Sequence, residues 1–173
     1  MIRAIVVMGV TGSGKSTLGS TLARALGWQF VEGDTLHPAA NIKKMAAGIP
    51  LDDQDRVPFL DNVAKALAES RPHGIVVSCS ALKRSYRDRI RAGEPHALFV
   101  LPVLTRAQLE ARLRVRAGHF MPASLLDSQL ATLEPPSADE LSLRIPGDEA
   151  LDLQVQRVLA TMPPHLVPEG LTR

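Results

Sequence analysis

One segment near the start of the chain combines glycines, a lysine and a serine at the spacing of a phosphate-binding loop. It reads Gly9-Val10-Thr11-Gly12-Ser13-Gly14-Lys15-Ser16 and fits the pattern G-x-x-x-x-G-K-[ST]. The glycines let the backbone wrap a phosphate chain, whose negative charge the exposed amides and the next helix N-terminus favour. We expect all eight residues to bind a nucleotide, with Lys15 at its β- and γ-phosphates as a catalytic group and Ser16 on Mg²⁺.

Two carboxylates, Glu32 and Asp34, are separated by one residue at the end of a short apolar run. Residues at this spacing project in similar directions from an extended chain, so one can face a metal ion and the other a substrate hydroxyl. We expect Asp34 to accept the hydroxyl proton as a catalytic and substrate-binding residue, and Glu32 to contact the metal. The alternatives are that Asp34 only caps the next turn and that Glu32 is solvated or acts on the metal through another group.

Basic and polar residues follow two of the apolar runs. Lys83 and Arg87 lie four positions apart after Ser78-Cys79-Ser80, and on one helical face they would suit a polyhydroxylated anion. A solvated basic stripe is the alternative. His37 is equally compatible with a hydrogen-bonded loop histidine and with a ligand to a polar substrate.

Two arginines, Arg112 and Arg116, share one face of a predicted helix that ends before Gly118. Guanidinium groups on a mobile lid can move onto a transferring phosphoryl group. We therefore expect a lid at about residues 115–124, both arginines in ATP binding, and Arg116 in catalysis. The alternative is a solvated basic helix.

Composition excludes several classes of function. Twenty Lys and Arg against eighteen Asp and Glu leave a net charge of +2, too small to imply nucleic-acid binding. The longest apolar runs, 4–10 and 97–104, fall short of the roughly 20 residues that a spanning helix needs. The single cysteine, Cys79, cannot form an internal disulfide and is expected to be a small buried hydrophobe. We expect a cytoplasmic protein without nucleic-acid or membrane partners.

Short apolar runs alternate with longer amphipathic stretches along the chain. We expect strands at 4–8, 29–31, 75–78, 97–101 and 141–145, and helices at 15–26, 38–47, 53–69, 83–92, 106–117, 124–133 and 151–162. Alternation of this kind predicts an α/β fold with a parallel sheet between two helical layers. We expect one domain over 1–173, a helix N-cap at Asp52 or Asp53, and a loose tail at 163–173.

Beyond the phosphate loop, several strings resemble the gluconokinases of the small P-loop type, which are related to shikimate kinase and the nucleoside monophosphate kinases. They are G-D-x-L-H-P at 33–38, N-I-x-K-M at 41–45, P-L-D-D-x-D-R at 50–56, C-S-A-L-K-x-x-Y-R-D at 79–88 and R-x-G-H-F at 116–120. The resemblance implies a three-layer α/β/α P-loop NTPase fold with a five-stranded parallel sheet and a helical lid. It also implies phosphorylation of D-gluconate at its terminal hydroxyl by ATP with Mg²⁺, giving 6-phospho-D-gluconate, in a homodimer.

The same resemblance assigns His37, Arg56, Lys83 and Arg87 to gluconate binding. Glu32 departs from the family, which usually carries Asp there. The stretch from 142 to 153 matches poorly and leaves the adenine-binding loop unassigned.

Two other functions are compatible with a phosphate loop. One is a different small-molecule kinase such as shikimate kinase, although Ser-Cys-Ser-Ala-Leu-Lys at 78–83 stands where that family's glycine-rich substrate loop is expected. The other is a nucleotide-dependent switch module, although the chain has no Asn-Lys-x-Asp string for reading guanine.

Overall fold

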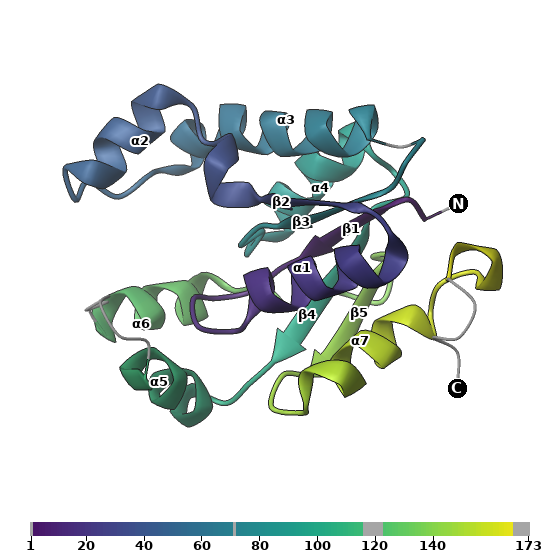
Figure 1. Ribbon diagram of the computed structural model, residues 1–173. Helices are drawn as coiled ribbons and strands as arrows, with labels where there is room; N and C mark the ends of the chain where they lie inside the picture. Colours follow the sequence, from purple (N-terminus) through teal and green to yellow (C-terminus); the bar gives the residue numbers. More distant parts are fainter. Residues whose placement is uncertain (1, 71, 116–122, 168–173) are drawn as a thin grey trace.

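Strands and helices alternate along the chain in the computed structural model, which describes residues 2–70, 72–115 and 123–167 (Figure 1). In chain order they are β1 (Ala4–Val7), α1 (Lys15–Leu26), β2 (Gln29–Glu32), the 3₁₀ helix η1 (Gly33–Leu36), α2 (Ala39–Ala46), α3 (Asp53–Glu69), β3 (Ile75–Ser78), α4 (Arg84–Gly93), β4 (Leu98–Val103), α5 (Arg106–Val115), α6 (Ala123–Thr132), β5 (Ser142–Pro146), α7 (Leu151–Leu159) and the 3₁₀ helix η2 (Pro164–Leu166). All the expected strands and helices are present, and within the described ranges the two 3₁₀ helices are the only additional elements.

The strands form one five-stranded sheet in the order β2-β3-β1-β4-β5, and every neighbouring pair is parallel. The carboxyl ends of all strands therefore meet at one edge, on the left of Figure 1. Ligands of such sheets bind beyond that edge. The phosphate loop leaves the central strand, β1, at this edge, between the polar segments that follow β2 and β3 on one side and β4 on the other.

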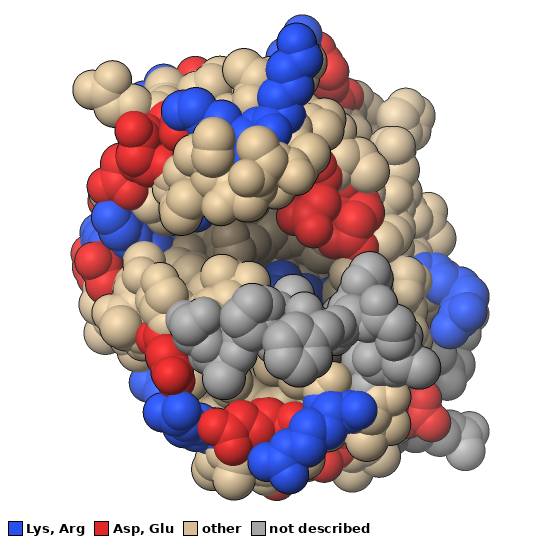
Figure 2. All heavy atoms as spheres, turned by 90° about the vertical axis from the view of Figure 1, so that its left-hand side faces the viewer, with Lys and Arg blue, Asp and Glu red and all other residues tan. Residues whose placement is uncertain are grey.

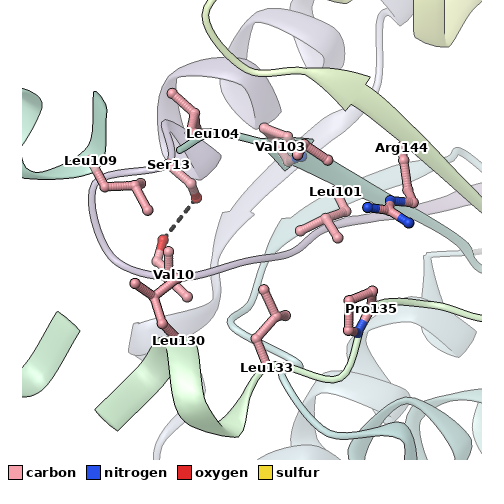
Figure 3. A pocket seen from close by; sticks show the side chains of 11 residues that line it. Val10, Ser13, Leu101, Val103, Leu104, Leu109, Leu130, Leu133, Pro135 and Arg144 are labelled. Carbon is pink, nitrogen blue, oxygen red and sulfur yellow. Dashed lines mark hydrogen bonds between the residues drawn. The ribbon is translucent and has the colours of Figure 1, made fainter. Parts of the chain in front are cut away.

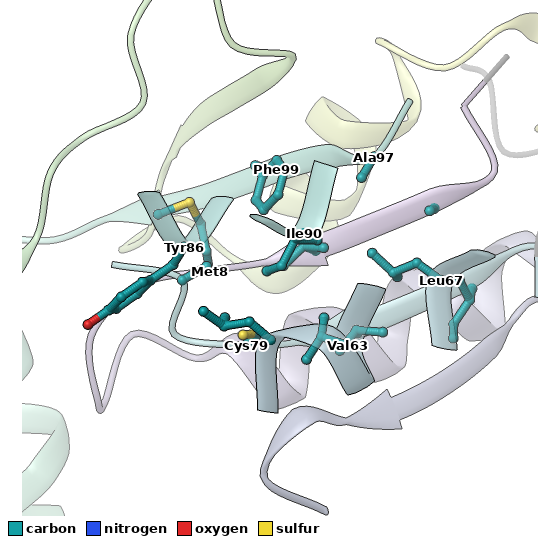
Figure 4. Close-up of a cluster of buried hydrophobic side chains, with 14 of the residues drawn as sticks. Met8, Val63, Leu67, Cys79, Tyr86, Ile90, Ala97 and Phe99 are labelled. Carbon is teal, nitrogen blue, oxygen red and sulfur yellow. The ribbon is translucent and has the colours of Figure 1, made fainter. Parts of the chain in front are cut away.

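Alternate residues of β1 pack against different helical layers. Ala4 and Val6 belong to a core cluster that includes α3 and α4 side chains such as Val63 and Ile90 (Figure 4). Ile5 and its neighbours on the opposite face pack against α1 and α7. The strand is thus covered on both sides, as its continuous apolarity predicts, and the three-layer α/β/α arrangement is confirmed.

The segment after α7 differs from the expectation of a loose tail. Residues 164–166 form η2, and Leu166 and Val167 are buried in the core cluster that contains α1 and α7. Prolines at 163 and 164 suggested a segment without structure, but this part of the tail packs its apolar side chains on the domain. Within the described ranges, every helix is too short or too polar to cross a bilayer.

Candidate active site

The phosphate loop connects β1 to the N-terminus of α1 at the carboxyl edge of the sheet. Gly12 and Gly14 have φ angles of +78° and +90°, a region that L side chains avoid. A Cβ on Gly12 would also come within 3.1 Å of the Leu113 side chain on α5. The glycines are therefore required both for the curvature of the loop and for the close packing of α5 against it.

Polar contacts within the loop place its lysine. Lys15 Nζ donates to the carbonyl oxygen of Val10 at 2.9 Å. Ser13 Oγ donates to the same oxygen at 2.8 Å (Figure 3). Ser16 is exposed in the first turn of α1, where its hydroxyl could ligate a metal ion beside the lysine. Sequence reasoning missed one further partner of the loop: Gln129 Oε1 on α6 accepts a hydrogen bond from Thr11 N at 2.7 Å.

The ends of β2 and β3 approach each other closely at Gly33. A Cβ at this position would lie 1.9 Å from the carbonyl oxygen of Ser78, so only glycine fits. Gly33 N donates to Ser78 Oγ at 3.2 Å, and that hydroxyl in turn donates to Glu32 Oε1. Ser78, the last residue of β3, thereby orients Glu32. The carboxylate oxygens of Glu32 are ligands that suit Mg²⁺.

Asp34 lies one residue beyond this contact, in the first turn of η1. Its side chain is exposed and makes no hydrogen bond to any described residue. Its backbone carbonyl accepts from His37 N at 3.4 Å. The carboxylate therefore does not cap the turn, and it remains available at the sheet edge for a substrate hydroxyl.

The ring of His37 is held by stacking and by one side-chain hydrogen bond. Its ring stacks on Phe59 with centroids 3.8 Å apart and an interplanar angle of 10°. Nδ1 lies 3.2 Å from Nδ2 of the buried Asn41, which also donates to Asp55 O at 2.8 Å. Burial lowers the pKa of His37, and Arg56 adds to this while Asp34 opposes it. A neutral ring that accepts at Nδ1 carries its proton on Nε2, as a donor for a polar ligand.

Arg56 and Lys83 come together around the ring of Tyr86. The Arg56 guanidinium carbon is 5.9 Å from the ring centroid, and Lys83 Nζ is 5.4 Å from it. Lys83 Nζ also lies 2.8 and 2.7 Å from the two carboxylate oxygens of Asp53, which accepts a further bond from the Tyr86 hydroxyl. Two cations from different segments thus share one patch, an arrangement that suits an anionic group on a ligand.

Arg87 is not in that patch, and its prediction as a substrate-binding residue is wrong. The side chain is fully buried. Its Nε and Nη2 donate to Glu140 at 2.6 and 2.9 Å, and its Nη1 donates to the carbonyls of Ala81 and Leu82 at 3.1 and 3.2 Å. The four-residue spacing predicted that Lys83 and Arg87 share one helical face. They do not, because α4 begins after Lys83, which is its N-cap.

Arg87 instead fixes the loop that connects β3 to α4. The loop contains Ala81, whose φ of +41° is unusual for a residue with a side chain. The backbone carbonyl of Ser80, in the same loop, accepts a hydrogen bond from Gly9 N of the phosphate loop at 3.1 Å. Arg87 therefore acts on the shape of the loop that carries Lys83, and its partner Glu140, 53 positions away, gives no local signal in the sequence.

Arg112 extends from α5 across the phosphate loop. Its Nη1 donates to Ser13 O at 3.3 Å, and its Nη2 donates to Gly147 O, after β5, at 2.6 Å. The predicted position beside the phosphates is consistent with these contacts. Arg116 and most of the predicted lid, residues 116–122, lie outside the described residues.

A small cavity and a wider surface hollow both lie near the phosphate loop. A small one of about 70 Å³ lies behind the phosphate loop, between Val10, Leu101, Leu130 and Leu133 (Figure 3), and is too small for a nucleotide. The face at the carboxyl edge of the sheet is more widely hollowed, and Figure 2 shows basic side chains within the hollow and acidic ones at its rim. Among the described residues, no three His, Cys, Asp or Glu side chains gather as a metal cage.

The parallel sheet, the phosphate loop on its central strand and the polar strand ends define a P-loop kinase, and residues 5–136 match the protein family described as AAA domain. A gluconokinase of Gluconobacter oxydans is 48% identical over 159 residues, covering 91% of this chain and 89% of the relative. The thermosensitive gluconokinase of Escherichia coli is 47% identical over 141 residues, covering 80% and 75%. The chain belongs to the gluconokinase family.

Solved structures agree with this assignment. A gluconokinase from Sinorhizobium meliloti superimposes with a TM-score of 0.83 at 47% identity, covering 91% of this chain and 89% of that one. A shikimate kinase from Bacteroides thetaiotaomicron reaches a TM-score of 0.67 at 21% identity, covering 91% and 96%. The second likeness shows the common fold alone, so shikimate kinase is only a distant relative.

Proposed function

We propose that this protein transfers the γ-phosphoryl group of ATP to the terminal hydroxyl of D-gluconate, giving 6-phospho-D-gluconate and ADP. The observation that carries the proposal is the grouping, at one sheet edge, of a phosphate loop, a carboxylate and a pair of cations. Phosphoryl transfer requires little covalent chemistry from the protein, so positioning and charge stabilisation are its main tasks. The family to which the chain belongs acts on an acceptor with both a hydroxyl and a carboxylate.

The nucleotide is assigned to the phosphate loop. Lys15 reaches the β- and γ-phosphates and stabilises the charge that they carry during transfer. Arg112 lies against the loop through Ser13 O, which supports a role in ATP binding. Arg116 is assigned to the transferring phosphoryl group from its spacing in the sequence.

Mg²⁺ is assigned to Ser16 and Glu32. The residues fit this ion, because both offer oxygen ligands and Mg²⁺ binds through one or two protein groups together with phosphates and water. The ion supplies charge neutralisation at the β- and γ-phosphates when it is bound. The protein's part is to orient Glu32 through Ser78 Oγ.

Gluconate is assigned to the segments after β2 and β3. Asp34 accepts the proton of the reacting hydroxyl. This role is supported by its exposed carboxylate, which makes no hydrogen bond to any described residue. Arg56 and Lys83 bind the carboxylate at the other end of the molecule, since charge-assisted hydrogen bonds are the strongest available there. His37 donates from Nε2 to a hydroxyl between these two ends.

The proposal extends to a homodimer in the cytoplasm. The homodimer follows from the resemblance to gluconokinases. The cytoplasm follows from the single cysteine, Cys79, which cannot form an internal disulfide and suits a reducing compartment. Light scattering on the purified chain measures the mass of the particle and distinguishes a dimer from a monomer.

The function is tested with a coupled assay of ADP release over a panel of aldonates, shikimate and nucleic acid. We expect rapid ADP release with gluconate, slower release with its stereoisomers, and little with shikimate or without an acceptor. Mass spectrometry of the product should show one added phosphate. ADP release that is equal with and without every sugar acid would contradict the proposal and favour the switch module.

A further inference from the structure

The peptide group between Val10 and Thr11 is held from both sides. Its carbonyl oxygen accepts from Lys15 Nζ at 2.9 Å and from Ser13 Oγ at 2.8 Å. Its N–H donates to Gln129 Oε1 at 2.7 Å. The C=O and N–H of a trans peptide point in opposite directions, so bonds on both sides fix the rotation of the peptide plane.

The contact from Gln129 crosses a long stretch of the chain. Gln129 lies on α6, 118 positions after Thr11. A small apolar cluster that contains Val10, Leu109 and Leu126 packs α6 and α5 against the loop. Apolar contacts have no direction, so this cluster holds α6 beside the loop without selecting a peptide orientation. Gln129 supplies the directional contact.

We propose that Gln129 is a positioning residue for the phosphate site: it keeps the Val10–Thr11 carbonyl turned toward Lys15, the residue that reaches the β- and γ-phosphates. The inference rests on the proposed ATP site. If the peptide rotated, its carbonyl oxygen would lose Lys15 and Ser13 and carry a partial negative charge to another face of the loop. Gln129 prevents this with an acceptor that is neutral, whereas a carboxylate there would repel phosphates.

The first test is Gln129→Leu, which keeps most of the side-chain volume and removes the acceptor. We expect KM for ATP to rise and kcat to fall, with a combined loss of about fivefold to tenfold, as for one lost hydrogen bond. KM for gluconate should stay within about twofold, since its ligands lie on other segments. The matched control is Gln156→Leu on α7, where the side chain is exposed, and it should change neither constant.

A second variant tests the role of Gln129 if Gln129→Leu does not fold. Gln129→Glu keeps an oxygen for Thr11 N and adds one negative charge beside the loop. We expect a normal Tm without ligand, but a smaller rise in Tm than the wild type with Mg²⁺ and a nonhydrolysable ATP analogue. The deficit should shrink as ionic strength rises, because salt screens the added charge. Gln156→Glu adds the same charge at an exposed position of α7 and should respond like the wild type.

The outcomes separate the inference from the function on which it rests. A wild-type Tm that does not rise with the ATP analogue would refute the nucleotide site, and the inference with it. A stabilised wild type together with unchanged kinetics in Gln129→Leu would overturn the inference alone. An equal rise of both KM values in Gln129→Leu would also overturn it, because that result would indicate a general packing role. A wild-type thermal response of Gln129→Glu would overturn the requirement for a neutral acceptor at this position.

Discussion

Lys83 and Asp53 form an ion pair in which the ammonium nitrogen lies 2.7 Å from one carboxylate oxygen and 2.8 Å from the other. The pair comes from segments 30 positions apart and lies beside Tyr86 and Arg56. The hydrogen bond from Lys83 is the main reason that the pKa of Asp53 is lowered. In the proposed gluconate site, the substrate carboxylate would therefore have to compete for Lys83 with a carboxylate that is already ionised.

Lys83→Ala should weaken gluconate binding specifically. We expect KM for gluconate to rise about tenfold or more, as for the loss of a charge-assisted hydrogen bond, with KM for ATP almost unchanged. Steady-state kinetics with each substrate varied in turn measures both constants. Lys65→Ala is the matched control, because Lys65 lies on α3 and its side chain is 71% exposed. An equal rise of both constants would place Lys83 in folding or assembly.

Lys15→Ala should abolish most phosphoryl transfer while leaving the fold intact. In the proposed site the lysine stabilises charge on the β- and γ-phosphates, so we expect a loss of about 10²–10³-fold in kcat. The far-ultraviolet circular dichroism spectrum and the Tm without ligand should resemble those of the wild type. Normal turnover by this variant would remove Lys15 from the catalytic assignment.

Asp34→Asn should lower kcat with a smaller effect on either KM. Asparagine keeps the shape but cannot take the hydroxyl proton, and it misplaces the hydroxyl. Because the transition state of phosphoryl transfer is loose, we expect a loss of about tenfold to a hundredfold. Asp52→Asn, at the N-cap of α3, is a control for loss of a nearby carboxylate. If Asp34→Asn kept a kcat near that of the wild type, the proton acceptor would have to be another group.

Glu140→Gln should destabilise the protein by leaving Arg87 buried beside a neutral side chain. We expect the free energy of unfolding to fall by about 3 kcal/mol, the usual cost of breaking a buried pair from one side. Urea denaturation measures this change. Asp139→Asn breaks an exposed pair with Arg84 and should have little effect. A loss no larger than that of Asp139→Asn would mean that the Arg87 contact contributes little.

Glu140 should also make part of the folding stability depend on pH in the acid range. Burial opposes ionisation of Glu140, but hydrogen bonds from Arg87, the Ser137 backbone and Arg91 outweigh it and lower the pKa to about 2, from 4.5. A lowered carboxyl pKa stabilises the folded state above the unfolded-state value, and this contribution is lost as the pH falls from 4.5 toward 2. Urea titrations across this range should show the loss in the wild type. Glu140→Gln should lack this component.

Local sequence patterns were sufficient for the architecture and for part of the site. The phosphate loop is a continuous motif, and the strands and helices are set by hydrophobic periodicity, so both were predictable from neighbouring residues. The capping prediction also held at Asp52, whose side chain accepts from Asp55 N within a capping box. Cys79 is buried, as expected.

Contacts between distant segments were not predictable in this way. Arg87 and Glu140 are 53 positions apart, and Thr11 and Gln129 are 118 apart. Nothing in the neighbourhood of Arg87 distinguishes an arginine that binds an anionic substrate from one that binds a buried carboxylate. The burial of Leu166 likewise depends on packing against the core cluster that contains α1 and α7 side chains, which a linear pattern of prolines does not reveal.

The environment of Cys79 has a practical consequence for chemical labelling. It is the only cysteine of the chain, and burial raises the pKa of its thiol to about 11. Maleimides and haloacetamides react with the thiolate, which is scarce at neutral pH for such a group and sterically shielded here. A single cysteine introduced at an exposed position should therefore accept a fluorophore or spin label selectively, with Cys79 left in place.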